Sequence, residues 1–237
     1  MISVVMPAHN EQDYLEAAVG MVLERLRGGE PPFEVLVAEN GSTDGTAAVA
    51  QRLAAANPEV LLLQAPAADY GQALRAGFMA SRGDVVVNCD VDSVDVGFFD
   101  RALAALGKEE VVLVVGSKRS PGALDLRNRG RKAVTAVFSA ILRGAFGLNV
   151  SDTHGHKAMR RAELSPLVDA CRFSGDIFDT ELILRAERAG LGVIEIPVTV
   201  TDQRPPRTPI ARRIPRSVVG LARLRLALWQ EGRPAKG

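Results

Sequence analysis

Short runs of apolar residues alternate along this chain with longer segments in which apolar residues recur every three or four positions. Uninterrupted β-branched and aliphatic runs are typical of strands buried on both faces, and the longer spacing is typical of amphipathic helices. The pattern predicts strands at residues 2–6, 33–38, 60–63, 84–89, 111–115 and 192–200. It predicts helices at residues 13–26, 43–56, 72–81, 98–106, 132–146 and 178–189, with Thr43 as a possible N-cap.

The order of these elements predicts the fold class. Strands separated by helices of about 10–15 residues form βαβ units, which build a parallel sheet covered by helices. We expect an α/β fold over residues 1–201, with a mostly parallel central sheet flanked by helices. Residues 202–237 are rich in Arg and Pro and form a separate C-terminal segment. Residues 152–161 interrupt the pattern with a polar stretch that holds two histidines.

Composition narrows the class of protein. The chain has 237 residues, of which 47% are apolar, and a formal net charge of +1, so it has enough apolar material for a packed core. The two cysteines, Cys89 and Cys171, lie far apart, which argues against a disulfide framework or a cysteine-built zinc site and favours a reducing compartment. We recognise no signal peptide and no run of the roughly 20 apolar residues needed to span a bilayer. These features predict a cytoplasmic protein.

Two carboxylates follow a short predicted strand of consecutive β-branched residues. The apolar run that contains Val85 and Val87 stops at Asp90 and Asp92. Ligands of open parallel sheets bind at the carboxyl ends of the strands, and paired carboxylates there suit Mg²⁺ or Mn²⁺. The alternative is that these aspartates cap a helix that begins near Gly97.

The first two strands also end in polar clusters. One is Pro7-Ala8-His9-Asn10-Glu11, and the other runs from Glu39 and Asn40 to Gly45. Because parallel strands end at one edge of the sheet, the three clusters together predict a single site. A nucleotide fits there, with acceptors for its base and ribose and a metal for its diphosphate. Taken alone, the second cluster has the composition of a turn followed by a helix cap.

Four ordered motifs resemble the family 2 glycosyltransferases, which have the nucleotide-sugar-binding GT-A fold. They are VMPAHNE (residues 5–11), VAENGSTDGT (37–46), GQALRAGF (71–78) and GDVVVNCDVD (83–92). Later motifs are similar to the dolichyl- or polyprenyl-phosphate mannose synthase branch of that family. These are GSK (116–118), RK (131–132), DT (152–153) with Lys157 and Arg160-Arg161, FDTEL (178–182) and EIPV (195–198).

The resemblance assigns roles to several residues. It implies a GT-A catalytic domain in which the base and ribose are lined by Pro7, Ala8, His9, Glu11, Glu39 and Asn40. Asp90 would face the ribose or the metal, and Asp92 would hold the metal on the diphosphate. The pair Glu39-Asn40 departs from the usual two aspartates, which leaves the base open.

The chain also departs from the mannose synthases in the rest of the metal site. They carry a Gln two residues beyond the second Asp, whereas this chain has Val94. Asp95 is one possible replacement, and His154 or His156 is another, because a late histidine is a metal ligand in many GT-A enzymes. A hydrogen-bonded histidine with a structural role is the alternative.

The acceptor determines which catalytic groups are needed. A lipid phosphate is already ionised near pH 7 and needs cations to hold it, with no general base. The loop after the fifth predicted strand supplies them: Lys118, Arg119, Arg127, Arg129, Arg131 and Lys132, against the single acid Asp125. From this set we assign Lys118, Arg119, Arg131 and Lys132 to the acceptor phosphate. A hydroxyl acceptor would instead need a carboxylate base, for which Asp176 or Asp179 are candidates.

The C-terminal segment suggests a membrane contact. Residues 203–230 carry seven arginines and no Asp, Glu or Lys. Helical spacing places Val218, Leu221, Leu224 and Leu228 on one face, with Trp229 beside them, as in interfacial helices on anionic leaflets. The alternative is a helix packed on the domain with its arginines outside. No nucleic-acid-binding motif is present.

Three functions remain at this stage. The first is an inverting, metal-dependent transferase that moves a sugar, mannose from GDP-mannose in the first instance, to polyprenyl phosphate at the cytoplasmic face of a membrane. The second is a soluble transferase of the same fold with a hydroxyl acceptor, for which a UDP-sugar donor is possible. The third is a non-catalytic nucleotide-sugar-binding module, against which the retained aspartates argue. The sequence does not determine the oligomeric state.

Overall fold

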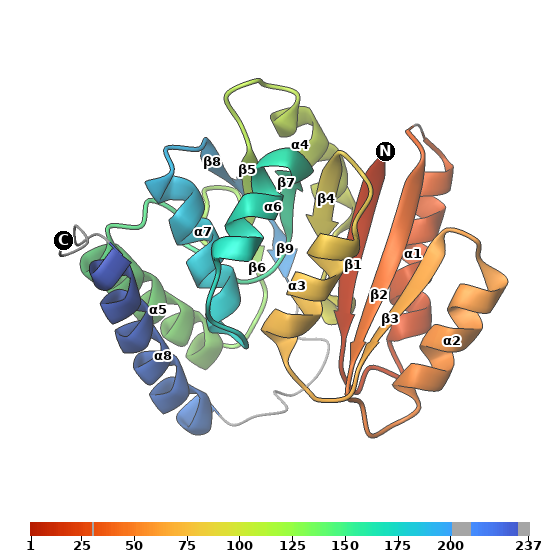
Figure 1. The fold of residues 1–237 in the computed structure, drawn as a ribbon, viewed down its shortest axis with the longest axis horizontal. Coiled ribbons are helices and arrows are strands. Elements are labelled where there is room, and N and C mark those ends of the chain that lie inside the picture. The colour runs from red at the N-terminus through yellow and green to blue at the C-terminus, as the bar shows by residue number, and fades with distance from the viewer. Residues whose placement is uncertain (30, 201–209, 232–237) are drawn as a thin grey trace, which may run out of the picture.

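A seven-stranded sheet with the strand order β3-β2-β1-β4-β7-β5-β8 runs through the molecule (Figure 1). The computed structural model describes residues 1–29, 31–200 and 210–231. The strands of this sheet are β1 (Ile2–Ala8), β2 (Phe33–Asn40), β3 (Val60–Ala65), β4 (Val85–Asn88), β5 (Leu113–Ser117), β7 (Lys157–Arg160) and β8 (Val193–Pro197). The strands β6 (Leu124–Asp125) and β9 (Thr199–Val200) pair with each other in a small second sheet.

Helices cover both faces of the sheet. One core is formed with α1 (Leu15–Arg27), α2 (Thr46–Ala56) and α4 (Val96–Leu106). The opposite core is formed with α3 (Tyr70–Ala80), α5 (Arg129–Phe146), α6 (Arg161–Ala170), α7 (Ile177–Arg188) and α8 (Ile210–Glu231). The predicted α/β class, with a mostly parallel sheet flanked by helices, is therefore confirmed.

The polar stretch at residues 152–161 contains a strand that the sequence pattern did not predict. Strand β7 lies antiparallel to both β4 and β5, while the other pairs in the large sheet are parallel. Its pattern differs from that of the other strands because only Ala158 and Met159 are apolar, between Arg160 and the buried Lys157. Helix α6 was also missed, and Pro166 lies within it.

Two local predictions need correction. Helix α2 begins at Thr46 and is capped by Gly45, so Thr43 lies in the preceding loop. The side chain that accepts hydrogen bonds at the start of α2 is that of Asp44. Its Oδ1 accepts from the Thr46 amide at 3.0 Å and from the Thr46 hydroxyl at 2.5 Å. The predicted strand at residues 192–200 is divided between β8 and β9, which belong to different sheets.

Helix α8 packs on the domain through the residues that were expected to face lipid. Leu221, Leu224 and Leu228 are only 5%, 0% and 5% exposed and belong to the core on the α7 side of the sheet. Val218, assigned to the same face, is instead 51% exposed. The expected lipid-facing stripe is thus wrong, because its leucines fill the gap between α8 and the domain. The Pro-rich residues 202–209 lie outside the described part of the chain.

No helix in the described ranges is long and apolar enough to cross a bilayer.

Ion pairs attach the C-terminal end of α8 to the rest of the domain. Glu231 forms ion pairs with Arg185 at 3.0 Å and with Arg172 at 3.1 Å, which connects α8 to α7 and to the loop before α7. Residues 221–231 of α8 therefore pack against the domain that contains the sheet.

Candidate active site

The three predicted polar clusters lie at one edge of the sheet. Strand β1 lies between β2 and β4, with Ala8 in register with Glu39 and Val5 in register with Asn88. All three strands run in the same direction, so their carboxyl ends meet at one edge. Pro7 and Ala8 form the end of β1, and Glu39 and Asn40 form the end of β2.

Asn40 joins three segments at this edge. Its side-chain amide donates to the Ala8 carbonyl at 3.0 Å, and its Oδ1 accepts from the Asp69 amide at 3.1 Å. Its own carbonyl accepts from His9 Nδ1 at 2.8 Å. Because a carbonyl only accepts, this contact places the His9 proton on Nδ1. An aspartate could not donate to Ala8, which gives a structural reason for the asparagine at this position.

The loops beyond the strand ends are also joined to each other. Asn10 has φ of +55° and accepts from the Thr43 amide at 2.8 Å, a side-chain bond that favours asparagine in this left-handed conformation. The buried Glu39 accepts from the Ser42 amide at 2.7 Å, and the Glu11 amide donates to Thr46 Oγ1 at 2.7 Å. The structure therefore brings together the residues assigned to the nucleotide.

Asp90 and Asp92 follow β4 as predicted, and neither of them caps α4. The cap of α4 is Asp95, whose Oδ1 accepts from the Phe98 amide at 3.1 Å and whose Oδ2 pairs with Arg101 at 3.1 Å. Asp95 is thereby occupied and is a poor replacement for the missing metal ligand. Asp90 precedes the short 3₁₀ helix Val91–Ser93, which contains Asp92.

The structure favours His156 over His154 as a further metal ligand. His156 is buried, and its Nε2 lies 2.6 Å from the Ser93 carbonyl, so Nε2 carries the proton and Nδ1 carries the lone pair. That Nδ1 is buried without a hydrogen-bond partner among the described residues. Burial lowers the pKa of His156, although nearby Asp90 opposes this, so a neutral imidazole is maintained. An unpartnered imidazole lone pair is a donor that a divalent metal accepts as a ligand.

His154 has other contacts. Its Nε2 donates to the Asp176 carbonyl at 3.1 Å, its Nδ1 lies 3.3 Å from Thr153 Oγ1, and its ring lies 5.4 Å from that of Phe138. Within the described residues no preformed cluster of three His, Cys, Asp or Glu side chains exists. Asp90, Asp92 and His156, the candidates for a metal site, therefore do not meet as such a cluster in this structure.

Asp179 forms a buried ion pair. Its Oδ2 lies 3.0 Å from Lys157 Nζ, and both side chains are 0% exposed. Lys157 also donates to the Gly155 carbonyl at 2.8 Å. Burial raises the pKa of Asp179, while Lys157 opposes the shift. This environment does not suit a general base that must reach an acceptor hydroxyl, which was one of the roles considered for Asp179.

Tyr70 connects Asp179 to the predicted metal site, and the sequence analysis did not assign it a role. Its hydroxyl lies 3.1 Å from Asp90 Oδ1 and 3.4 Å from Asp179 Oδ2. Burial of the hydroxyl and the two carboxylates raise the pKa of Tyr70 well above its ordinary value, so it remains a donor. The sequence feature that could have pointed to Tyr70 is its position directly before the third motif, residues 71–78. Lys157 belongs to a stretch that resembles the mannose synthases, but the spacing of residues along the chain does not predict its partner Asp179 on α7.

The basic loop is less uniform than its sequence suggests. Lys118 donates to Asp152 Oδ2 and to the His154 carbonyl, both at 2.8 Å, and only 12% of its side chain is exposed. Arg127 pairs with Asp125 at 2.8 Å. Burial alone would raise the pKa of Asp152, but Lys118 and His154 together outweigh it and the pKa is lowered. Lys118 therefore has a structural partner within the chain, which weakens its assignment to the acceptor.

The other acceptor candidates lie at the start of α5 and before it. Arg119 and Lys132 are exposed. Asn128 caps α5 by accepting from the Arg131 amide at 3.0 Å, so Arg131 is held in the first turn of the helix. The positive end of a helix and its basic side chains together favour an anion at this position.

Comparison with known proteins identifies the family of this chain. A family model described as glycosyl transferase family 2 matches residues 3–166. An undecaprenyl-phosphate mannosyltransferase of Micrococcus luteus is 32% identical, covering 98% of this chain and 97% of that protein. A polyprenol monophosphomannose synthase of Mycolicibacterium smegmatis is 31% identical, covering 84% of this chain and 77% of that one. Glycosyltransferase AglD of Haloferax volcanii is 32% identical over 83% of this chain, but the aligned region spans only 32% of that relative.

Solved structures support the fold. Glucosyl-3-phosphoglycerate synthase from Mycobacterium tuberculosis, in complex with Mn²⁺, UDP and phosphoglyceric acid, superposes with a TM-score of 0.69 at 21% identity, covering 100% of this chain and 80% of that one. At this identity the likeness concerns the fold alone. The family match and the curated relatives carry the assignment: the chain belongs to glycosyl transferase family 2 and is a glycosyltransferase with the GT-A fold.

Proposed function

We propose that this glycosyltransferase is an inverting, metal-dependent enzyme that transfers a sugar from a nucleotide-sugar donor to a polyprenyl phosphate. Mannose from GDP-mannose is the donor to test first, because two relatives are named for mannose transfer to polyprenyl carriers. The base remains part of the proposal, since the Mycobacterium tuberculosis structure holds UDP.

The observation that carries the proposal is the buried pair of Lys157 and Asp179. An acceptor hydroxyl must lose its proton during transfer and needs a base within reach, whereas a phosphate is already ionised. Asp179 is completely buried beside a lysine. A hydroxyl acceptor would therefore have to rely on Asp176, at the start of α7. The phosphate acceptor needs only cations, which Arg119, Arg131 and Lys132 supply.

Donor binding is assigned to the edge formed by β1, β2 and β4. Pro7, Ala8, His9, Glu11, Glu39 and Asn40 would line the base and ribose. Asp90, Asp92 and His156 would hold Mg²⁺ or Mn²⁺ on the diphosphate. When bound, such a metal neutralises the charge that develops on the leaving diphosphate. Tyr70 would hold Asp90 in place through the hydrogen bond from its hydroxyl.

A polyprenyl phosphate acceptor implies work at a lipid surface. We propose that the chain is a peripheral protein of the cytoplasmic membrane face, with a nucleotide-sugar and a lipid phosphate as its partners and no nucleic acid. The exposed basic residues at the start of α5 support this, because they would meet phosphates in the headgroup region.

The test is a transfer assay with purified protein. GDP-mannose, UDP-glucose and other nucleotide sugars would each be incubated with polyprenyl phosphate, with polyprenol and with sugar acceptors, with and without Mn²⁺ or Mg²⁺. We expect a lipid-linked sugar phosphate product with one donor, formed only with the phosphorylated lipid and abolished by chelation. Transfer to a hydroxyl acceptor and none to polyprenyl phosphate would replace the proposal with the hydroxyl-acceptor function.

A further inference from the structure

Helices α5 and α8 present exposed apolar side chains on one face of the molecule. On α5, Val137 is 61% and Ile141 39% exposed, and on α8, Leu226 is 52% and Trp229 54% exposed. Further exposed apolar residues continue each row: Ala133, Ala140 and Gly144 on α5, and Val218, Val219 and Ala222 on α8. We call these residues the α5/α8 face. The spacing of three to four residues makes each row a stripe along its helix.

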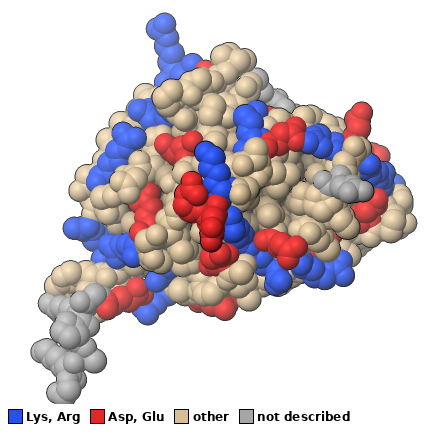
Figure 2. Space-filling view, turned by 90° about the horizontal axis from the view of Figure 1, so that it is seen from above, with Lys and Arg blue, Asp and Glu red and all other residues tan. Residues whose placement is uncertain are grey.

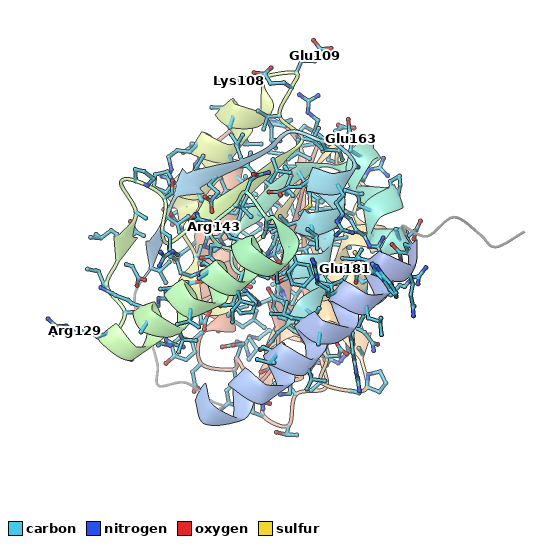
Figure 3. The ribbon with its side chains drawn as sticks, turned by 90° about the vertical axis from the view of Figure 1, so that its left-hand side faces the viewer. Lys108, Glu109, Arg129, Arg143, Glu163 and Glu181 are labelled. Atoms are coloured by element: carbon cyan, nitrogen blue, oxygen red, sulfur yellow. The ribbon has the colours of Figure 1, made fainter. Side chains whose placement is uncertain are left out.

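The two helices that carry these stripes lie next to each other. Arg225 of α8 donates to the Ala145 carbonyl of α5, and its guanidinium lies 5.8 Å from the centre of the Phe146 ring. Figure 3 shows α5 and α8 side by side across the side of the molecule that faces the viewer, with Arg129 and Arg143 on α5. Near the C-terminal end of α8, Leu226 and Trp229 border a hollow that is also lined by Arg188 and Arg225. The two helices that carry the α5/α8 face are thus in contact near the C-terminal end of α5.

The charge of this surface is of one sign. Helix α5 contains Arg129, Arg131, Lys132 and Arg143 and no acidic residue. Residues 217–231 of α8 contain Arg223, Arg225 and one acid, Glu231, which is paired with Arg185 and Arg172. The face seen from above in Figure 2 differs, because acidic and basic side chains are intermingled on it.

We propose that the α5/α8 face is the surface by which the protein lies on an anionic lipid leaflet. This inference rests on the proposed function. It differs from the expectation from sequence, because the lipid-facing residues of α8 are Val218, Leu226 and Trp229, whereas Leu221, Leu224 and Leu228 are buried against the domain. Bulky aliphatic residues and a tryptophan among arginines match the headgroup boundary, where apolar side chains are buried and cations meet lipid phosphates.

A leaflet fits this surface better than a second copy of the chain. A twofold dimer would bring the same face of each copy together and oppose arginines with arginines. An anionic leaflet supplies the opposite charge, and the hollow beside Arg188 and Arg225 has the chemistry to hold a lipid phosphodiester. Because Arg131 lies in the first turn of α5, this orientation would also bring the proposed acceptor cations to the level of the lipid phosphates.

Trp229 gives a direct measurement on the unmodified protein, because it is the only tryptophan in the chain. On adding vesicles of phosphatidylcholine with 30–40% phosphatidylglycerol (roughly the anionic content of a charged leaflet), we expect its emission to shift to shorter wavelength and to be quenched by brominated acyl chains. If the protein sediments with the vesicles but its tryptophan emission does not change, the proposed orientation is wrong.

A pair of double variants tests the surface itself. Val137→Glu with Leu226→Glu places charge in both stripes, and we expect vesicle binding to weaken by about tenfold or more, since two large apolar side chains lose their burial. The matched control is Met21→Glu with Met79→Glu, at side chains 44% and 48% exposed on α1 and α3. The control should bind as the unmodified protein does. Equal binding by both double variants would overturn the proposal.

Two further measurements separate this inference from the proposed function. All four substituted positions are exposed, so unfolding midpoints should be unchanged, and transfer to a short-chain, water-soluble isoprenyl phosphate should proceed at the unmodified rate. If the unmodified protein binds vesicles through this face but does not use the isoprenyl phosphate, the surface stands and the proposed acceptor falls. If the unmodified protein dimerises and Val137→Glu with Leu226→Glu makes it monomeric without affecting vesicle binding, the face is a dimer interface and the proposal is wrong.

Discussion

Lys157 Nζ lies 3.0 Å from Asp179 Oδ2 in the interior of the protein, and neither side chain has any exposed surface. Lys157 comes from the antiparallel strand β7 and Asp179 from α7, so the pair connects the sheet to the helix layer. Tyr70 extends the connection to Asp90. The position of Asp90 in the site is thus coupled to a buried ion pair.

Removing one partner of this pair should destabilise the fold. Lys157→Met leaves Asp179 buried without its cation, and we expect a loss of about 3–5 kcal/mol in the free energy of unfolding. Adding Asp179→Leu replaces the pair with apolar side chains and should recover most of the loss. Urea denaturation measures both. Lys108→Met, at an exposed lysine near the top of Figure 3, is the control and should change little.

Tyr70→Phe should lower turnover while leaving the fold intact. It removes a hydrogen bond to Asp90 and retains the ring, so one bond to a charged group, about 1.5–3 kcal/mol, is lost from the positioning of the site. We expect a decrease in kcat of up to about 10- to 150-fold with little change in unfolding midpoint. An unchanged kcat would mean that the hydroxyl does not position Asp90 during the reaction.

Asp92→Asn should weaken the binding of a nucleoside diphosphate in the presence of Mn²⁺ by tenfold or more, because a carboxylate ligand becomes a neutral amide. Isothermal titration calorimetry with and without the metal measures the effect. Asp100→Asn, on α4 at an exposed carboxylate paired with Arg25, is the control. Metal-dependent affinity that survives in Asp92→Asn would remove Asp92 from the metal site.

Arg131→Ala should affect the acceptor and spare the donor. A phosphate held by several cations loses a charge-assisted hydrogen bond of about 1.5–3 kcal/mol, which corresponds to a rise of about 10- to 150-fold in the apparent KM for polyprenyl phosphate, or an equivalent loss of turnover. Donor affinity, measured by titration, should be unchanged. Arg52→Ala, at an exposed position on α2, is the matched control. A loss of donor binding would assign the loop to the other substrate.

Stability should depend on pH through Glu34, far from the site. Burial would raise the pKa of Glu34, but hydrogen bonds from Ser3 and Arg82 outweigh it and hold the pKa below its ordinary value. A lowered folded-state pKa stabilises the fold above the unfolded-state value of about 4.3, and this contribution is lost as the pH falls through the folded-state value. Glu34→Gln should therefore be destabilising at pH 7, by about 1–3 kcal/mol, and progressively less so below pH 4.

Chemical denaturation from about pH 7 down to pH 3 follows this difference across the range in which carboxylates titrate. Glu16→Gln is the control, because Glu16 is 64% exposed in its pair with Arg52 and should contribute little at any pH. A Glu34→Gln effect that stays constant with pH would show that the charge of Glu34 does not stabilise the fold.

The sequence by itself determined the α/β class, most of the strands and helices, and the edge at which Asp90, Asp92, His9 and Asn40 meet. These follow from local periodicity and from the rule that parallel strands end at one edge, so short-range information is sufficient. It did not reveal β7, because a strand with a buried lysine does not match the apolar run of its neighbours.

Only the tertiary structure decided between equivalent local patterns. Helix α8 has two apolar stripes, and packing buried Leu221, Leu224 and Leu228 while leaving Val218, Leu226 and Trp229 exposed. In the sequence Lys118 is equivalent to its basic neighbours, and only the fold brings it to its partner Asp152, which is distant along the chain. Lys157, Asp179 and Tyr70 come from three elements, and their shared contacts depend on how those elements pack. Charge pairs of this kind carry no periodicity, so the fold has to bring the partners together before they can be identified.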